Sequence, residues 1–199
     1  LLGLGGLLHD LGRDEHAMVC FERCAELAPN RCSRALARSG AGATLGDMGK
    51  LGQALEFLRE AIPDLEPGAA ATAIGDEGAI LLERGEYDNA KARLEESLRL
   101  ARKAGGPWTQ ARALMRLGRW HGELGRIEDA ERCFRECITV SRIIEMPFFL
   151  PEALRFRARF RLARGADRGR ADADESLELA RETGNPFELA ESLSTLGRF

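Results

Sequence analysis

The sequence lacks an apolar run that could cross a membrane and an opening segment that could serve as a secretory leader. A membrane-spanning helix needs about 18 consecutive apolar residues, and no stretch of this chain approaches that length. Residues 1–12 are apolar, but glycine interrupts them and no basic residue precedes them, which does not fit a signal peptide. We therefore predict a cytoplasmic protein with no membrane partner.

The sequence also has few cysteines and almost no net charge. Its five cysteines are an odd number, and 199 residues rich in helix formers do not need a disulfide framework. The formal net charge is only -3 although 31% of the residues are charged, and a nucleic-acid-binding domain would show a basic excess. These shortages exclude a disulfide scaffold and a nucleic-acid partner.

Aromatic residues make up only 6% of the chain, whereas glycine occurs 22 times and follows a period. One set of small residues is separated by 37, 36, 40, 40 and 39 positions: Gly5, Gly42, Gly78, Gly118, Ala158 and Gly197. A second set of glycines recurs with the same spacing: Gly12, Gly49, Gly85, Gly125 and Gly165. Self-similarity at a fixed period is the signature of a repeat architecture.

Each repeat has the pattern of two helices joined by a short turn. The turn glycine suits the left-handed backbone that often ends a helix, and acidic residues follow it, as Glu86 and Asp88 do after Gly85, where they favour the start of a second helix. Within that helix, apolar residues recur every three or four positions, which predicts one buried stripe. We expect the small residues to bring the paired helices close together, with Gly118 facing Ala130. The pattern predicts an all-α protein.

These features resemble the tetratricopeptide repeat family over essentially the whole chain. The first repeat matches the family pattern at Leu4, Gly5, Leu8, Ala17, Phe21 and Pro29. The repeats are longer than the usual 34 residues and look like the long form found in bacterial signalling ATPases, kinases and maltose-activator-type regulators. The resemblance implies a right-handed α-solenoid whose first helices form a concave face, with each repeat packing on its neighbours.

We expect one array over residues 1–199, cut from a longer chain because it does not begin with Met. Its approximate repeats are 1–30, 31–68, 69–108, 109–148, 149–187 and a partial repeat at 188–199. In the fifth repeat, the second helix fits best when it is keyed on Ala173, Leu177 and Ala180. That register places about three extra residues in the preceding turn, between Ala166 and Asp172.

Patterns that resemble chemical sites are incomplete. Residues 40–50 approach a phosphate-binding loop, but Thr44 stands where its first glycine belongs and Leu51 replaces the hydroxyl residue. His16, Cys20 and Cys24 have helical spacing that would suit zinc, yet the repeat assigns Cys24 to a small packing position shared with Cys137. No nucleophile motif is present. We predict no enzyme, no cofactor and no metal.

Arginine is concentrated in the later first helices. The residues that follow the small position are Gly6, Ala43, Ala79, Arg119, Arg159 and Arg198. In the family this row faces the concave groove, so the resemblance implies stacked arginines suited to carboxylates. The predicted partner-binding residues are Arg112, Met115, Arg119, Arg155, Arg159 and Arg198. The alternative is a solvated face, or one neutralised by Glu152 and Glu191.

Three functions remain open on this basis. The first is a protein-interaction or sensor scaffold that binds an acidic peptide in its C-terminal groove and an apolar segment beside Gly6, Ala43 and Ala79. The second is an intramolecular regulatory arm of a larger signalling ATPase, kinase or transcription activator. The third is self-association through the exposed end repeats.

Overall fold

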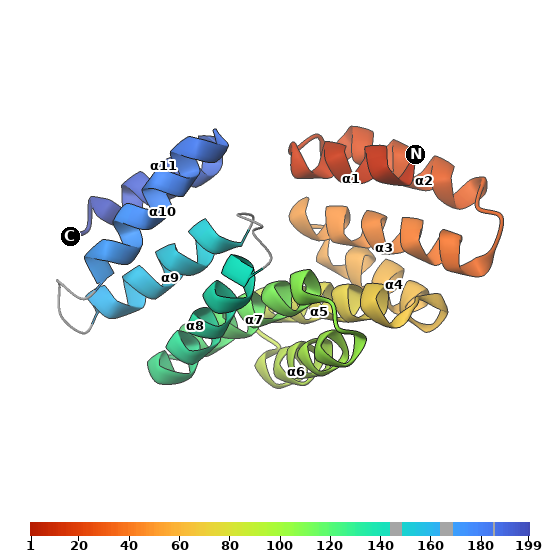
Figure 1. Cartoon of the computed structure of the whole chain (residues 1–199). Coiled ribbons are helices and arrows are strands. Elements are labelled where there is room, and N and C mark those ends of the chain that lie inside the picture. Colours follow the sequence, from red (N-terminus) through yellow and green to blue (C-terminus); the bar gives the residue numbers. More distant parts are fainter. Residues whose placement is uncertain (144–148, 164–168, 185) are drawn as a thin grey trace. The chain divides into compact units, whose positions relative to one another are not determined.

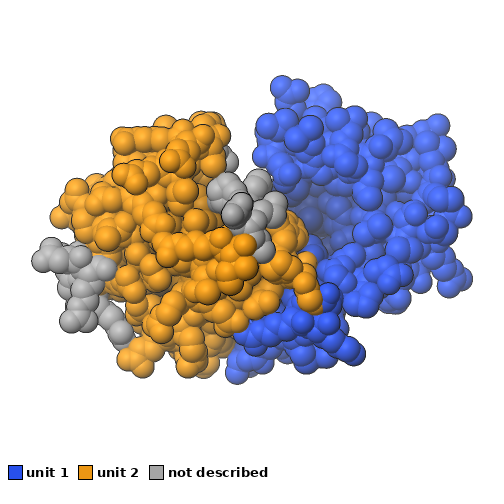
Figure 2. Space-filling model, in the orientation of Figure 1, with its two compact units in different colours: residues 1–104 blue, residues 105–199 orange. Residues whose placement is uncertain are grey.

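The computed structural model describes residues 1–143, 149–163, 169–184 and 186–199. These ranges contain eleven α-helices, one short 3₁₀ helix and no β-strand, which confirms the all-α prediction. None of the helices in these ranges has both the length and the apolar character needed to cross a membrane. The chain divides into two compact units, Leu1–Ala104 and Gly105–Phe199, coloured separately in Figure 2.

Unit 1 contains three helix pairs (Figure 1). Its elements are α1 (Leu2–Asp10), α2 (Asp14–Glu26), α3 (Arg31–Asp47), α4 (Leu51–Ala61), the 3₁₀ helix η1 (Ile62–Asp64), α5 (Pro67–Glu83) and α6 (Tyr87–Ala104). Each pair is joined by a three-residue turn, and α2 packs on α3 while α4 packs on α5. Helices α2, α3, α4 and α5 therefore each contact their own partner and a helix of a neighbouring pair.

Unit 2 contains two further pairs and a last helix. Its elements are α7 (Pro107–Glu123), α8 (Ile127–Ile143), α9 (Leu150–Leu162), α10 (Arg170–Thr183) and α11 (Pro186–Leu196). Helix α9 contacts α7, α8, α10 and α11. Side chains on α9 are consequently surrounded by neighbours from the rest of the unit.

Four helix pairs share the same turn geometry. Gly125, the middle residue of the turn between α7 and α8, has a φ of 68°. The backbone N–H of Arg126 then donates to the carbonyl of His121 at 2.9 Å, the bond that closes a Schellman-type helix end. Positive φ values also occur at Gly12, Gly49 and Gly85. The prediction for these turn glycines is confirmed, while Gly165 lies outside the described residues.

The first set of small residues makes room for a large side chain of the paired helix. A Cβ atom on Gly118 would lie 2.6 Å from the ring of Phe134. The same relation joins Gly5 to Phe21, Gly42 to Leu58 and Gly78 to Leu94. Close packing between the helices is thus confirmed. At Gly118 the three nearest atoms belong to the ring of Phe134, one turn after Ala130 on α8, and the contact with Ala130 stays a prediction.

A polar side chain near the middle of the second helix ties several pairs together. Ser97 Oγ on α6 donates to the Ala71 carbonyl at 2.7 Å, and Ser176 Oγ on α10 donates to the Pro151 carbonyl at 2.9 Å. Cys137 Sγ on α8 makes the corresponding bond to the Ala111 carbonyl at 3.3 Å. Burial raises the pKa of the Cys137 thiol from 9.0 to about 12. This cysteine packs as a neutral donor in the core.

The fifth helix pair follows the predicted register. Ala173, Leu177 and Ala180 are all buried on α10. The turn before α10 extends over residues 163–169, of which 164–168 lie outside the described residues. At its end, a Cβ atom on Gly169 would lie 2.4 Å from the Ala158 carbonyl oxygen. The position on the first helix that is glycine in the earlier pairs is Ala158 here. The close backbone contact is made instead by Gly169, in the turn before α10.

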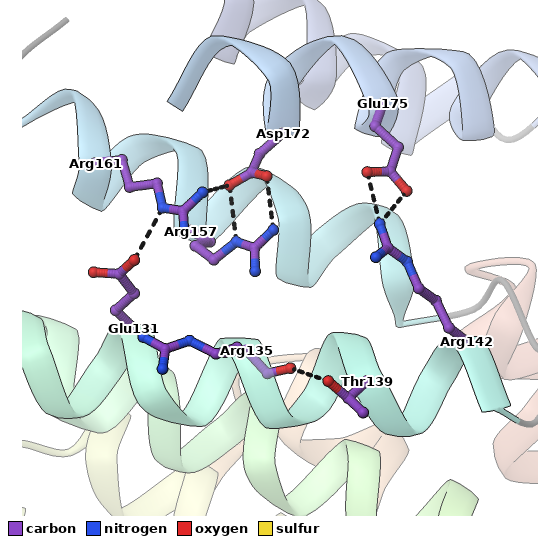
Figure 3. A network of polar contacts seen from close by, with 8 residues as sticks. All are labelled: Glu131, Arg135, Thr139, Arg142, Arg157, Arg161, Asp172 and Glu175. Atoms are coloured by element: carbon purple, nitrogen blue, oxygen red, sulfur yellow. Dashed lines mark hydrogen bonds and ion pairs between the residues drawn. The ribbon is translucent and has the colours of Figure 1, made fainter. Parts of the chain in front are cut away.

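A network of ion pairs holds α10 against α9 and α8 (Figure 3). Asp172, which is only 5% exposed, accepts from Arg157 at 2.7 and 2.8 Å and from Arg161 at 3.0 Å. Arg161 also donates to Glu131 on α8 at 2.9 Å. Arg142 on α8 reaches Glu175 on α10 at 2.6 Å. Asp172, Arg157, Arg161 and Glu131 thus form a chain of ion pairs that connects three helices.

Candidate binding site

Three of the predicted arginines line one cavity in unit 2. Arg119 comes from α7, Arg159 from α9, and Arg198 follows the end of α11. The cavity has a volume of about 420 Å³. Its other lining residues are Gly122, Glu123, Ile127, Phe156, Phe160 and Ala163. We call this cavity the arginine pocket; it places three guanidinium groups from separate helical segments around an apolar surface.

The apolar surface of the arginine pocket is aromatic. The guanidinium carbons of Arg119 and Arg159 lie 5.9 and 5.8 Å from the centroid of the Phe156 ring. Phe156 and Phe160 both stack on the buried ring of Phe134. Their ring centroids lie 5.6 and 5.7 Å, respectively, from the centroid of Phe134. The rings are therefore held by the core, and the two guanidinium groups are held over a fixed ring.

Sequence reasoning did not identify the aromatic residues as part of the site. Phe156 and Phe160 are four residues apart, so they share one helix face, and this spacing was the available signal. Gly122 could not have been recognised in the same way. A Cβ atom there would lie 2.2 Å from Cζ of Phe160, a contact that depends on the packing of α7 against α9.

Acidic neighbours neutralise only some of the predicted arginines. Burial raises the pKa of the Glu152 carboxyl above its usual 4.5, while the positive charges of Arg119 and Arg155 oppose that rise. Arg159 and Arg198 have no ion-pair partner within the described ranges. The arginine pocket therefore keeps cationic groups that a ligand could neutralise.

Three other residues of the predicted binding set lie outside the arginine pocket. Met115 is 3% exposed and belongs to the core of α7. Arg155 is 4% exposed, forms an ion pair with Glu188 and lies 3.9 Å from Glu191. Arg112 stacks on Trp108 with 5.3 Å between the guanidinium carbon and the ring centroid. Met115 and Arg155 are almost fully buried in the chain by itself, so a contact of either residue with a partner stays a prediction.

The N-terminal row and the incomplete motifs occupy helical positions in unit 1. Gly6, Ala43 and Ala79 are half-buried on α1, α3 and α5, and their contact with an apolar segment stays a prediction. Residues 40–47 of the loop-like motif are helical, with the Thr44 hydroxyl bonded to the Gly40 carbonyl at 3.0 Å. Their backbone N–H groups are used by the helix and are not arranged to bind phosphate.

No group of three or more metal-ligating side chains gathers anywhere in the part of the chain that the structure describes. Cys20, Cys24 and Cys32 are half-buried. His9 lies 3.3 Å from Asp14 and 3.5 Å from Asp47, bridging α1 to α2 and α3 through pairs of residues. These contacts are those of a packed helical array.

Comparison with family models finds tetratricopeptide repeats in two stretches of the chain. One model with this description matches residues 69–143 and another matches residues 1–31. No curated protein matches the sequence. The family resemblance inferred from the repeat pattern is confirmed.

Solved structures share the helical-repeat solenoid fold at low sequence identity. A thermophilic tetratricopeptide repeat protein of Thermus thermophilus, TTC0263, is 20% identical with a TM-score of 0.77, covering 98% of this chain and 96% of that one. Aspartyl phosphate phosphatase F of Bacillus subtilis is 16% identical with a TM-score of 0.80, covering 94% of this chain and 52% of that one. The Rap conjugation gene regulator of plasmid pLS20, solved with the Phr* peptide, is 16% identical with a TM-score of 0.84, covering 94% and 54%. The chain spans about half the length of these last two proteins.

Proposed function

The chain belongs to the tetratricopeptide repeat family, and from this we propose that it is a protein-interaction scaffold whose arginine pocket binds an acidic segment of a partner protein. The observation that carries the proposal is the convergence of Arg119, Arg159 and Arg198 on one cavity. The Rap regulator similar to this chain was solved with a bound peptide, which supports peptide binding by this fold. We assign no catalytic step to the segment.

The chemistry of the arginine pocket suits a carboxylate next to an apolar side chain. A guanidinium group presents a planar fork that binds a carboxylate through two parallel hydrogen bonds. Phe156 and Phe160 provide the apolar surface between the arginines. An acidic peptide with apolar residues between its carboxylates would satisfy both parts, and the volume of about 420 Å³ suits a few side chains, not a folded domain.

The test measures peptide affinity across salt concentration. The probe is a fluorescein-labelled peptide of alternating Glu and Leu, and its Gln/Leu counterpart serves as the uncharged control. The Arg119→Glu/Arg159→Glu double variant should bind the acidic peptide at least about tenfold more weakly, since each charge-assisted contact contributes roughly 1.5–3 kcal/mol. An Arg135→Glu/Arg181→Glu variant changes the same charge at exposed positions outside the pocket. Equal binding by both double variants, with no dependence on salt, would contradict the proposal.

A second function is favoured by the length of the similar regulators. The chain spans about half of aspartyl phosphate phosphatase F and of the Rap conjugation gene regulator. We infer, as this second function, that the array acts as the regulatory arm of a larger signalling protein, with the arginine pocket binding an acidic segment of the same polypeptide. The coding sequence on either side of this segment distinguishes the two functions: a nucleotide-binding, kinase or DNA-binding domain there favours the arm, and further repeats alone favour the free scaffold.

Self-association through end helices is the remaining proposal for a partner. Leu4 and Leu7 on α1 and Leu11 directly after it are at least half exposed, and their spacing of three and four residues puts them along one side of the helix. Size-exclusion chromatography with light scattering checks it: a Leu4→Lys/Leu7→Lys variant should change a dimer to a monomer if this face joins two copies.

A further inference from the structure

A second cavity lies in unit 1, between α2, α3 and α4, and shares no residue with the arginine pocket. Its volume is about 370 Å³. Phe21 of α2 and Phe57 of α4 line it together with Ala37 and Ala41 of α3. We call it the α2–α4 pocket. Its apolar lining consists of two aromatic rings and small alanine side chains.

Charged residues of opposite sign line the same cavity from two different helices. Arg34 and Arg38 belong to α3, whereas Glu22 and Glu26 belong to α2. Glu26 is paired with Arg23 at 2.7 Å. Arg34 and Glu22 have no ion-pair partner in the described part of the chain and do not pair with each other. Both residues are exposed at the rim of the cavity, so it offers one cation from α3 and one anion from α2 that are not paired with another described residue.

Arg38 is only partly satisfied by its neighbours. Its guanidinium carbon lies 4.8 Å from the centroid of the Phe57 ring, and Nη2 donates to Glu60 of α4. The Glu60 side chain is 62% exposed, so solvent screens this ion pair and weakens it. The buried Nε of Arg38 has no hydrogen-bond partner among the residues that the structure describes. Glu60 thus engages one nitrogen of a group that can bind a carboxylate with two.

We propose that the α2–α4 pocket binds a free α-amino acid with an apolar side chain. The ligand's carboxylate pairs with Arg34 and Arg38, its ammonium group pairs with Glu22, and its side chain lies between Phe21 and Phe57. A zwitterion complements a cavity that offers both signs of charge, whereas a simple anion would meet the unpaired carboxylate of Glu22.

The size of the cavity favours a ligand as small as one amino acid. Ligand pockets commonly measure about 300–1,000 Å³, and about 370 Å³ is near the lower end of that range. An internal peptide segment has neither a free carboxylate nor a free ammonium group on its backbone, so it would match the two charges only through its side chains, whereas one free amino acid carries both groups on a single carbon atom. The proposal goes beyond peptide binding in unit 2, and neither depends on the other.

Glu60 makes the proposal sharply testable, because it is an internal competitor for Arg38. A ligand carboxylate must displace it or share the guanidinium group with it, and removing Glu60 should therefore tighten binding. Loss of Arg38 should weaken binding. Substitutions of Arg38 and of Glu60, the two partners of one ion pair, should thus change the ligand affinity in opposite directions. A simple loss of protein stability would weaken binding in both variants.

The experiment titrates the folded chain with L-phenylalanine, followed by calorimetry and by ¹H–¹⁵N NMR shifts of α2, α3 and α4. We expect Arg38→Met to weaken binding about tenfold and Glu60→Gln to tighten it about threefold. Glu56→Gln, the same charge change one turn earlier on α4 and outside the pocket, should leave it unchanged. Phenylalaninamide and N-acetyl-L-phenylalanine, which each lack one charge, should bind about tenfold more weakly.

Three outcomes overturn the proposal. The first is the absence of any shift with L-phenylalanine or L-leucine at about 1 mM, the weak end of specific affinities. The second is N-acetyl-L-phenylalanine binding as tightly as the zwitterion, which would make the site one for carboxylates alone. The third is weaker binding by Glu60→Gln, which would show that Glu60 supports the ligand and does not compete with it.

Discussion

The ring of Phe134 occupies the space that a side chain on Gly118 would fill, since a Cβ atom there would lie 2.6 Å from Cε1 of the ring. Phe134 is fully buried and in turn stacks on Phe156 and Phe160. One glycine on α7 thus permits the ring arrangement that forms the aromatic side of the arginine pocket. The packing of Phe134 against Gly118 inside the helix pair therefore helps to set the geometry of the arginine pocket.

Replacing Gly118 by alanine should destabilise the protein despite the better helix propensity of alanine. The added methyl group overpacks the contact with Phe134, and such insertions reduce the free energy of unfolding by about 1–3 kcal/mol. Gly52→Ala on α4 is the matched control, because nothing lies within 4 Å of a Cβ atom there; it should add about 0.5–1 kcal/mol. Urea unfolding of both variants checks the pair, and equal changes would refute the packing argument.

Cys137 should make the wild-type protein sensitive to alkaline pH. Burial raises its pKa from 9.0 to about 12, so above pH 9 the unfolded chain loses a proton that the folded chain keeps. The free energy of unfolding then falls as pH rises, by roughly 1 kcal/mol at pH 10. Cys137→Ser keeps the donor to Ala111, as Ser97 does at the corresponding position. The difference between the two proteins, measured by denaturant unfolding, should be constant below pH 8 and change above pH 9.

Asp172 should be far more important to stability than its exposed neighbour Asp174. Asp172→Ala leaves Arg157 and Arg161 without their shared carboxylate in a buried site, and breaking such a pair costs about 3–5 kcal/mol. Asp174 is 51% exposed in its pair with Arg170, so Asp174→Ala should cost less than about 1 kcal/mol. Thermal unfolding compares the two. Similar losses would mean that the network in Figure 3 contributes little.

Glu152 should make the folded state less stable as pH rises from acid toward neutral. Burial raises the pKa of its carboxyl in the folded protein, so the folded chain holds a proton that the unfolded chain releases. The free energy of unfolding therefore decreases from pH 4.5 up to the raised pKa and then levels off. Glu152→Gln removes this dependence. Unfolding curves between pH 4 and pH 8 should show the variant gaining relative to wild type; a constant difference would contradict the assignment.

Much of the fold was readable from residue spacing. The recurrence of Gly12, Gly49, Gly85 and Gly125 predicted helix ends with a left-handed residue, and each has a positive φ. The keyed positions Ala173 and Ala180 predicted the register of α10 across a longer turn, and both are buried. These predictions succeed because turn geometry and helical periodicity are local properties. Cys137 was also assigned to packing correctly, since its repeat position is shared with Ser97.

The site was predictable only in part. Spacing placed Arg119, Arg159 and Arg198 in one row, and these three line the arginine pocket. It could not distinguish them from Arg155, which is one helical turn before Arg159 and is buried against Glu188. Whether an arginine on α9 faces a cavity or an acidic neighbour depends on the position of α11, which residue spacing within α9 does not contain.

The amino-acid order determined the helices, their turns and the family of this protein, because backbone conformation follows from glycine position and from apolar period over a few residues. Tertiary packing decided which charges remain for a ligand. Phe160 finds room only beside Gly122, and Asp172 binds two arginines from α9. Such pairings join residues from different helices, and their energies depend on burial and distance, which arise only when the helices pack.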